Sequence, residues 1–199
     1  RGQDAAGIVS FDGNHFHERK DNGLVKDVFR QRHMDALPGR SAMGHVRYPT
    51  AGSLSAKEAQ PFFVNAPFGI YLIHNGNLTN TEELRKRTQE NYSRHLRTSS
   101  DSEVLLNVFA DQIYQIRKHD TNVSPEDVVF EAAKKTMNEV KGAYSVITMI
   151  DQVGMFAFRD RKGIRPLVIG KRITTKGTDW MVASEDVSIK ALGYETVRN

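Results

Sequence analysis

Four polar residues of this chain could together hold an amino acid by its two charged groups and one carbonyl oxygen. They are Arg47, Asn75, Gly76 and Asp101, which lie in motifs at residues 44–50, 74–78 and 99–103. A guanidinium binds a carboxylate through two parallel hydrogen bonds, and an asparagine amide with a glycine N–H can donate to one oxyanion. A carboxylate in the first turn of a helix stays ionised and can pair with an ammonium group. The set predicts a site for an α-carboxylate, an α-amino group and an oxyanion.

Each of these residues also has a simpler interpretation. Arg47 could form an ordinary surface ion pair, and Asp101 could be an acidic residue that only favours a helix start. Asn75 and Gly76 could form a turn that leaves the buried apolar segment at residues 70–73. The joint occurrence of the three motifs in this order favours the substrate site. A thiol nucleophile for such a site is missing, because the chain has no cysteine.

Other kinds of site have less support. His15 and His17 lie on one face of a predicted strand, but no third ligand is near them in the sequence, so we predict no metal site. Gly154, Gly163 and Gly170 are typical of turns. The chain has neither a Gly-x-Ser-x-Gly motif nor a P-loop.

The hydrophobic pattern predicts strands, then helices, then strands again. Apolar or alternating segments bounded by turn residues predict strands at residues 5–11, 15–20, 42–47, 62–64, 69–73, 143–150, 155–159, 166–171 and 180–184. Helical spacing predicts helices at residues 23–37, 82–90, 100 to about 117, 124–142 and 188–192. This order favours an α+β domain with antiparallel sheets, and the length of 199 residues favours one domain.

Three of the predicted helices have sequence signals for their first turn. Thr79 with Glu82, and Ser100 with Glu103, have the spacing of a capping box. Ser124 is followed by Pro125, which places serine at the cap and proline at the first helical position.

Composition and charge exclude several classes of protein. Hydrophobic residues make up 39% and charged residues 26%, as in soluble globular proteins, and no apolar segment approaches the roughly 18 residues that span a bilayer. Without disulfides or a signal sequence, the chain is expected to be cytoplasmic. The net charge is +4, and a basic cluster at residues 85–97 could bind nucleic acid. Acidic residues are interspersed with it, so we predict a solvated surface and no nucleic-acid partner.

Eight motifs extend the chemical pattern over nearly the whole chain. They are RGQDAAG (1–7), GHVRYPTAG (44–52), EAQPF (58–62), HNGNLTN (74–80), TSSDSE (98–103), FRD (158–160), GIRPL (163–167) and ASE (183–185). In these motifs the chain resembles the glutaminase domain of the glutamine phosphoribosylpyrophosphate amidotransferases, which are class II glutamine amidotransferases. The related glucosamine-6-phosphate synthases would have Arg-Trp-Ala-Thr at residues 47–50.

The resemblance implies an N-terminal-nucleophile hydrolase fold, a four-layer αββα sandwich. It implies that a cysteine thiol attacks the glutamine side-chain amide, that ammonia leaves, and that water releases glutamate from the thioester. By the same resemblance Arg47 binds the substrate carboxylate and Asp101 binds the ammonium group, while Asn75 and Gly76 form the oxyanion hole. Arg1 would help to orient the catalytic amino terminus, and Thr50 would join the substrate-binding residues.

The resemblance also sets expectations beyond these residues. The cysteine is expected about 20 residues upstream of Arg1, so we expect a sequence truncated at both ends that does not hydrolyse glutamine by itself. A phosphoribosyltransferase domain with a Mg²⁺ site is expected after residue 199, and the full protein is expected to form a homo-oligomer. The alternatives are another class II amidotransferase, of the glucosamine-6-phosphate synthase type, or a non-catalytic domain that binds glutamine for regulation.

Overall fold

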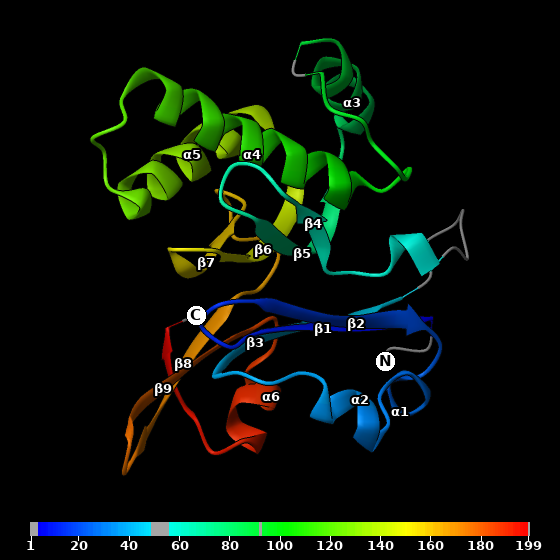
Figure 1. Ribbon diagram of the computed structural model, residues 1–199, viewed down its shortest axis with the longest axis vertical. Helices are drawn as coiled ribbons and strands as arrows, with labels where there is room; N and C mark the ends of the chain where they lie inside the picture. The colour runs from blue at the N-terminus through cyan, green and yellow to red at the C-terminus, as the bar shows by residue number, and fades with distance from the viewer. Residues whose placement is uncertain (1–3, 49–55, 92, 199) are drawn as a thin grey trace.

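The chain forms four layers in a computed structural model that describes residues 4–48, 56–91 and 93–198 (Figure 1). The longer helices cover one face of a central sheet, a second β layer lies below that sheet, and shorter helices lie below the second layer. The predicted αββα sandwich is therefore confirmed. None of the helices in the described ranges is long and apolar enough to cross a membrane.

The strands of the described residues belong to three antiparallel sheets. The central sheet has the order β4-β5-β6-β7, and the second β layer contains the sheets β2-β1-β3 and β10-β8-β9. The strands are β1 (Ala5–Phe11), β2 (Phe16–Asn22), β3 (Ser41–Arg47), β4 (Phe62–Val64), β5 (Ile70–Leu78), β6 (Gly142–Ile150), β7 (Gly154–Arg159), β8 (Val168–Thr174), β9 (Gly177–Ala183) and β10 (Glu195–Arg198).

Most of the helical residues belong to the longer helices above the central sheet. The helices are α1 (Val25–Val28), α2 (Gln31–Asp35), the 3₁₀ turn η1 (Ala56–Glu58), α3 (Thr81–Glu90), α4 (Asp101–His119), α5 (Pro125–Glu139) and α6 (Asp186–Ala191). In Figure 1, α3, α4 and α5 lie above the central sheet, and α1, α2 and α6 lie at the opposite end.

Strands β5 and β6 are buried on both faces, so each contributes to two hydrophobic cores. Alternate side chains of a strand point to opposite faces. Tyr71 and Ile73 of β5 pack toward the lower layer, in a cluster with Val9 and Met43. Their neighbours on β5, such as Leu72, pack toward the upper helices in the larger cluster. This two-sided burial makes the pair the rigid centre on which the site is built.

Two of the predicted helix starts differ from the structure. Helix α5 begins as predicted, because the Ser124 side chain accepts from the Asp127 N–H and proline occupies the first turn. Helix α3 begins after Asn80 instead of Thr79, and Asn80 makes no side-chain cap. Ser100 caps α4 by accepting from the Ser102 N–H, but the predicted capping box is wrong, because the Glu103 carboxylate binds backbone N–H groups in the preceding segment.

The predicted helix at residues 23–37 is also wrong. The structure has two short helices, α1 and α2, separated by extended backbone at Phe29 and Arg30. The carbonyl of Val28 accepts from the Arg19 side chain at 3.5 Å and contacts His33 Nδ1 at 2.8 Å. These side chains compete for an oxygen that a continuous helix would use in its own ladder.

The basic cluster at residues 85–97 is tied into the fold. Arg87 forms an ion pair with Glu139 of α5, and Gln112 of α4 donates to the same carboxylate at 2.7 Å. Arg85 donates to the Thr98 carbonyl at 3.0 Å. Two of these guanidinium groups therefore hold helices and loops together, which agrees with a structural role for the cluster.

Candidate functional site

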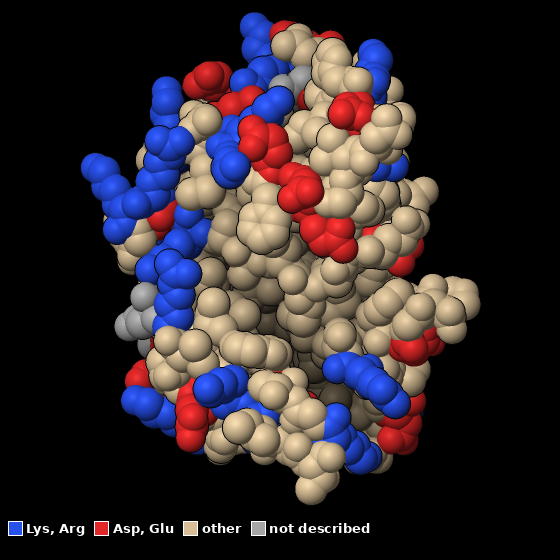
Figure 2. Space-filling view, turned by 90° about the vertical axis from the view of Figure 1, so that its left-hand side faces the viewer, with Lys and Arg blue, Asp and Glu red and all other residues tan. Residues whose placement is uncertain are grey.

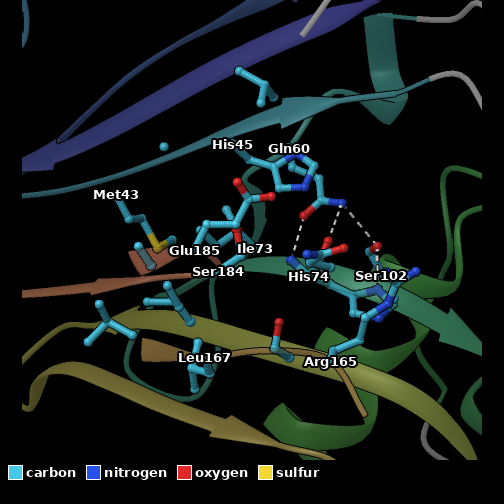
Figure 3. Close-up of a pocket in the computed structure, with 18 of the residues that line it drawn as sticks. Met43, His45, Gln60, Ile73, His74, Ser102, Arg165, Leu167, Ser184 and Glu185 are labelled. Atoms are coloured by element: carbon cyan, nitrogen blue, oxygen red, sulfur yellow. Dashed lines mark hydrogen bonds between the residues drawn. The ribbon is translucent and has the colours of Figure 1, made fainter. Parts of the chain in front are cut away.

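A cleft of about 1610 Å³ opens between the central sheet and the lower β layer. Figure 2 shows the side of the molecule hollowed in this way, and Figure 3 shows side chains that line the cleft. Arg47, Asn75, Gly76 and Asp101 all line it, although they come from β3, β5 and the start of α4. The structure thus brings together four of the predicted site residues. The other two, Arg1 and Thr50, lie outside the described residues.

Arg47 is held at the end of β3 by two carboxylates. Its guanidinium donates to Glu58 at 2.5 Å and lies 3.8 Å from Asp4. Glu58 is buried and also accepts from the Ser99 hydroxyl at 2.8 Å. The ion pair is mostly buried, because the Arg47 side chain is only 14% exposed. A guanidinium has five N–H donors, so this anchoring is compatible with binding a further carboxylate.

Asn75 and Gly76 do not form the turn that was their alternative interpretation. They lie within β5, which runs on to Leu78 and pairs Asn75 with Ser145 and Gly76 with Tyr144 of β6. The predicted end of this strand at residue 73 is wrong, because pairing with β6, almost 70 residues further along the chain, extends the strand past the polar motif. A Cβ atom at Gly76 would lie 2.1 Å from the Ala143 carbonyl oxygen, so only glycine fits.

The backbone of β5 presents a row of donors on the edge away from β6. In an antiparallel strand, the N–H groups of alternate residues point to the same side. The N–H of His74 donates to Gln60 at 2.6 Å, and that of Leu78 donates to Asp101 at 3.0 Å. The N–H of Gly76 lies between them on the same edge. Strand β4 does not cover it, because β4 pairs only with residues 70–72. The geometry therefore directs this donor toward the cleft.

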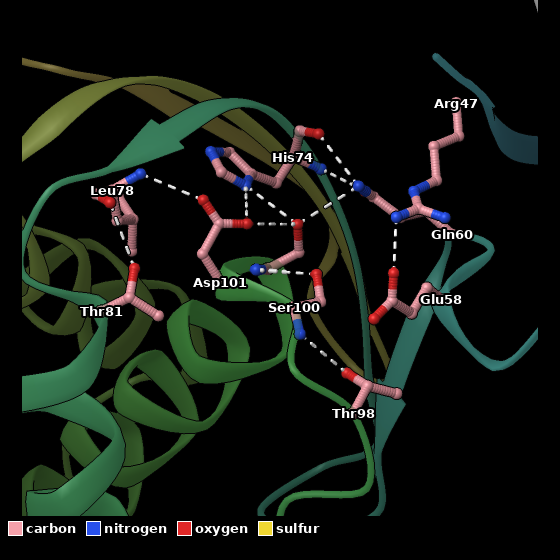
Figure 4. Close-up of polar contacts among 10 residues, drawn as sticks. Arg47, Glu58, Gln60, His74, Leu78, Thr81, Thr98, Ser100 and Asp101 are labelled. Atoms are coloured by element: carbon pink, nitrogen blue, oxygen red, sulfur yellow. Dashed lines mark hydrogen bonds and ion pairs between the residues drawn. The ribbon is translucent and has the colours of Figure 1, made fainter. Parts of the chain in front are cut away.

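Asp101 lies at the first position of α4, with its carboxylate against β5 (Figure 4). Besides the Leu78 N–H, it accepts from the Ser102 hydroxyl at 3.4 Å and lies 3.6 Å from His74 Nδ1. Burial alone would raise the pKa of this carboxyl. The nearby imidazole of His74, together with the Leu78 N–H and the Ser102 hydroxyl, outweighs burial and holds the pKa below its ordinary value. The carboxylate is thus kept ionised, as binding an ammonium group requires.

Two imidazoles lie beside these residues. Burial, together with the nearby His74, lowers the pKa of His45 to about 4, so His45 is neutral at physiological pH. His74 is buried, and its Nδ1 lies 2.9 Å from the Ser102 hydroxyl. The neutral His45 therefore adds no charge beside Arg47 and Asp101 in this part of the cleft.

The family model for the glutamine amidotransferase domain matches residues 45–191 of this chain. The chain belongs to this family. Curated relatives of the glutamine amidotransferase domain are amidophosphoribosyltransferases. The protein from Escherichia coli is 54% identical over 201 residues, and that from Schizosaccharomyces pombe is 48% identical. Both alignments cover 100% of the chain, but only 39% and 37% of those proteins.

The solved structures to which this chain is similar support the same family assignment. One is a glutamine phosphoribosylpyrophosphate amidotransferase from B. subtilis in complex with ADP and GMP, with a TM-score of 0.77 and 31% identity. Another is described as the allosteric regulatory enzyme of purine biosynthesis, with a TM-score of 0.80 and 32% identity. Each match covers 99% of the chain and 39% of the solved chain. The N-terminal-nucleophile hydrolase fold is thereby confirmed.

The sequence did not assign roles to several residues that support the glutamine amidotransferase site. Gln60 binds the backbone of His74 through both atoms of its amide, since it also donates to the His74 carbonyl at 3.1 Å. Gly7 of β1 packs against the backbone of Gln60, and a Cβ atom at Gly7 would lie 2.0 Å from the Gln60 carbonyl oxygen. Gln60 and Gly7 both lie in motifs that carried the resemblance, but a motif alone does not show which backbone groups a side chain reaches.

Asp160 organises the loop that leads to Arg165, one of the residues that line the cleft. Its Oδ1 accepts from the N–H groups of Lys162 and Ile164, each at 3.1 Å, and its Oδ2 accepts from Arg165 at 3.2 Å. The Tyr144 N–H contributes a fourth bond at 3.4 Å. Burial acts to raise the pKa of Asp160, but these backbone donors outweigh it and lower the pKa below 3.8.

Replacing Asp160 by asparagine should destabilise the domain by about 2–3 kcal/mol at neutral pH. The new amide group would face two N–H donors where an oxygen now accepts. Because the folded-state pKa is depressed, the stabilisation is present above pH 3.8 and is lost as the pH falls through the folded pKa. The difference in unfolding temperature between wild type and variant should therefore shrink below about pH 3.8.

Asp120→Asn is the matched control for this measurement. Asp120 is exposed and its carboxylate accepts from the backbone N–H of Asn122. Its replacement should cost less than about 1 kcal/mol. Equal unfolding temperatures for the two variants would contradict the role assigned to Asp160.

Proposed function

We propose that this chain is the glutaminase part of an amidophosphoribosyltransferase. In this proposal the full protein hydrolyses glutamine to glutamate and ammonia, and passes the ammonia to phosphoribosyl pyrophosphate to make 5-phosphoribosylamine in purine synthesis. The observation that carries it is the cleft in which Arg47, Asp101 and the β5 edge at Gly76 converge. The 54% identity to the E. coli enzyme over the whole chain supports the same assignment.

The cleft residues suit the two charged ends and the reacting amide of glutamine. Arg47 would bind the α-carboxylate and Asp101 the α-ammonium group, so the substrate is fixed before reaction. The Asn75 amide and the Gly76 N–H would donate to the oxygen of the side-chain carbonyl as it becomes a tetrahedral oxyanion. Donors that gain strength as the charge develops lower the barrier, and one of them is typically worth about a hundredfold in rate.

The remaining parts of the reaction are assigned to residues outside this sequence. The chain has no cysteine, so the thiol nucleophile implied by the family would be supplied from elsewhere in the full protein. Residues 1–199 alone are therefore expected not to hydrolyse glutamine. In this proposal, phosphoribosyl transfer, with its Mg²⁺, is carried out by a further part of the full protein. Cytoplasmic location and a homo-oligomer remain parts of the proposal.

The test is ammonia release from glutamine by the full-length protein, with and without phosphoribosyl pyrophosphate. We expect release that rises when phosphoribosyl pyrophosphate is added, with phosphoribosylamine as the coupled product. Glutaminase activity without any response to phosphoribosyl pyrophosphate would favour another class II amidotransferase. If the protein binds glutamine but releases no ammonia under either condition, a regulatory glutamine-binding domain becomes the better assignment.

A further inference from the structure

Three side chains form a continuous bridge along the exposed edge of β5. Gln60 binds the N–H of His74 at one end, and Asp101 binds the N–H of Leu78 at the other. Ser102 joins them, because its hydroxyl accepts from the Gln60 amide at 3.2 Å and donates to Asp101 at 3.4 Å. The labelled contacts of Gln60 and Ser102 are visible in Figure 3. The bridge thus spans the strand on both sides of the Gly76 N–H.

The direction of the hydrogen bonds in this bridge follows from the donors available. The Gln60 Nε2 can only donate, and an ionised Asp101 can only accept, so the Ser102 hydroxyl must accept from one and donate to the other. The remaining acceptor position of Ser102 suits the Nδ1–H of His74, at 2.9 Å. The hydroxyl therefore makes one donated and two accepted bonds, which is its full capacity. Because Ser102 is 2% exposed, water cannot replace a lost partner easily.

We propose that Gln60 and Ser102 are positioning residues that hold the Gly76 N–H in place as an oxyanion donor. This inference rests on the proposed glutaminase reaction. The part of a strand that is paired on one edge only can shift. Beyond residues 70–72, which pair with β4, the Gln60 and Ser102 side chains support the free edge of β5 in place of a strand. Neither residue needs to touch the substrate. They act through the backbone of β5.

A positioning role for an oxyanion donor has a specific kinetic signature. The oxyanion exists only in the transition state and the tetrahedral intermediate, so misplacing its donor lowers kcat and leaves KM nearly unchanged. In the full-length protein, Ser102→Ala should lower kcat for glutamine about tenfold, and Gln60→Glu should lower it by about 10- to 100-fold. KM should stay within about threefold of wild type in both variants.

The matched control is Ser10→Ala. Ser10 is a buried serine on β1 that lies outside the bridge, and its hydroxyl has no hydrogen-bond partner in the described part of the chain. Ser10→Ala therefore removes a buried hydroxyl, as Ser102→Ala does, and we expect it to leave β5 unchanged. Formation of phosphoribosylamine from added ammonia, which bypasses the glutaminase site, reports whether the rest of the full-length protein remains active in each variant. Hydrogen exchange of the peptide that contains residues 70–78 gives a second readout, and it should be faster in the two bridge variants only.

Each outcome decides the proposal. A fall in kcat with KM retained, together with faster exchange in β5, supports it. Values of kcat within twofold of Ser10→Ala would overturn it, and so would a rise in KM at unchanged kcat, since the bridge would then serve binding alone. Loss of ammonia-dependent and glutamine-dependent activity together would assign the bridge a merely structural role, which also overturns it. If wild type releases no ammonia, the proposed function fails, while the exchange measurement still tests the bridge.

Discussion

Replacing Arg47 by alanine in the full-length protein should raise KM for glutamine by about 30- to 1000-fold. Removing one partner of a desolvated, hydrogen-bonded charge pair costs about 2–4 kcal/mol, and each 1.4 kcal/mol is a factor of ten. The α-carboxylate is bound equally in the ground state and the transition state, so kcat should change little. Steady-state ammonia release over a range of glutamine concentrations measures both constants.

The control for Arg47 must separate binding from stability, because Glu58 loses its buried cation in the variant. Adding Glu58→Gln to Arg47→Ala should restore much of the unfolding temperature and leave KM high. Arg172→Ala removes an exposed guanidinium paired with Asp179 and should leave KM close to wild type. If Arg47→Ala lowers kcat with KM unchanged, Arg47 does not bind the substrate carboxylate.

Replacing Gly76 by alanine should destabilise the domain by about 3–5 kcal/mol and abolish glutamine hydrolysis. The added Cβ would lie 2.1 Å from the Ala143 carbonyl oxygen and 2.7 Å from the Tyr144 Cα, both backbone atoms that cannot rotate away. The strands β5 and β6 would have to separate at the site. Thermal unfolding of the full-length protein, with ammonia release at saturating glutamine, measures both effects.

Gly44→Ala is the comparison for this second variant. A Cβ atom at Gly44 would approach the Ile8 side chain at 3.3 Å, and a side chain can adjust by a few tenths of an ångström. We expect a cost below about 1 kcal/mol. If Gly76→Ala unfolds at the same temperature as Gly44→Ala, the close pairing of β5 with β6 at this position is wrong.

Local signals predicted much of the fold. Strand β1 has the predicted bounds, and α5 begins at the predicted cap, because an apolar run and a Ser-Pro pair act within a few residues. The prediction of one helix at residues 23–37 failed, because the helical spacing of this segment could not show that Arg19 and His33 compete for the Val28 carbonyl. The final strand, β10, was not predicted, because its residues are exposed and its pairing with β8 is the main reason for its extended form.

The candidate site was predicted in part. The resemblance placed Arg47, Asp101, Asn75 and Gly76 in one site, and the structure places them in one cleft, while their roles remain predictions. The partners that hold these residues were not predicted. Gln60 lies 42 residues from Ser102 in the sequence, and nothing in either motif indicates that their side chains meet. Such partners follow from the packing of β5 against α4 and not from spacing along the chain.

The close approach of Gly7 to Gln60 has a consequence for how this domain tolerates sequence change. The distance between β1 and the segment that precedes β4 is set here by backbone atoms, because a Cβ at Gly7 would lie 2.0 Å from the Gln60 carbonyl oxygen. Side chains in the two cores can therefore be exchanged for others of similar volume while this spacing is preserved. Changes of side chain in the cores are thus separated from this contact, and the constraint is concentrated at Gly7, where any added side chain would meet the backbone of Gln60.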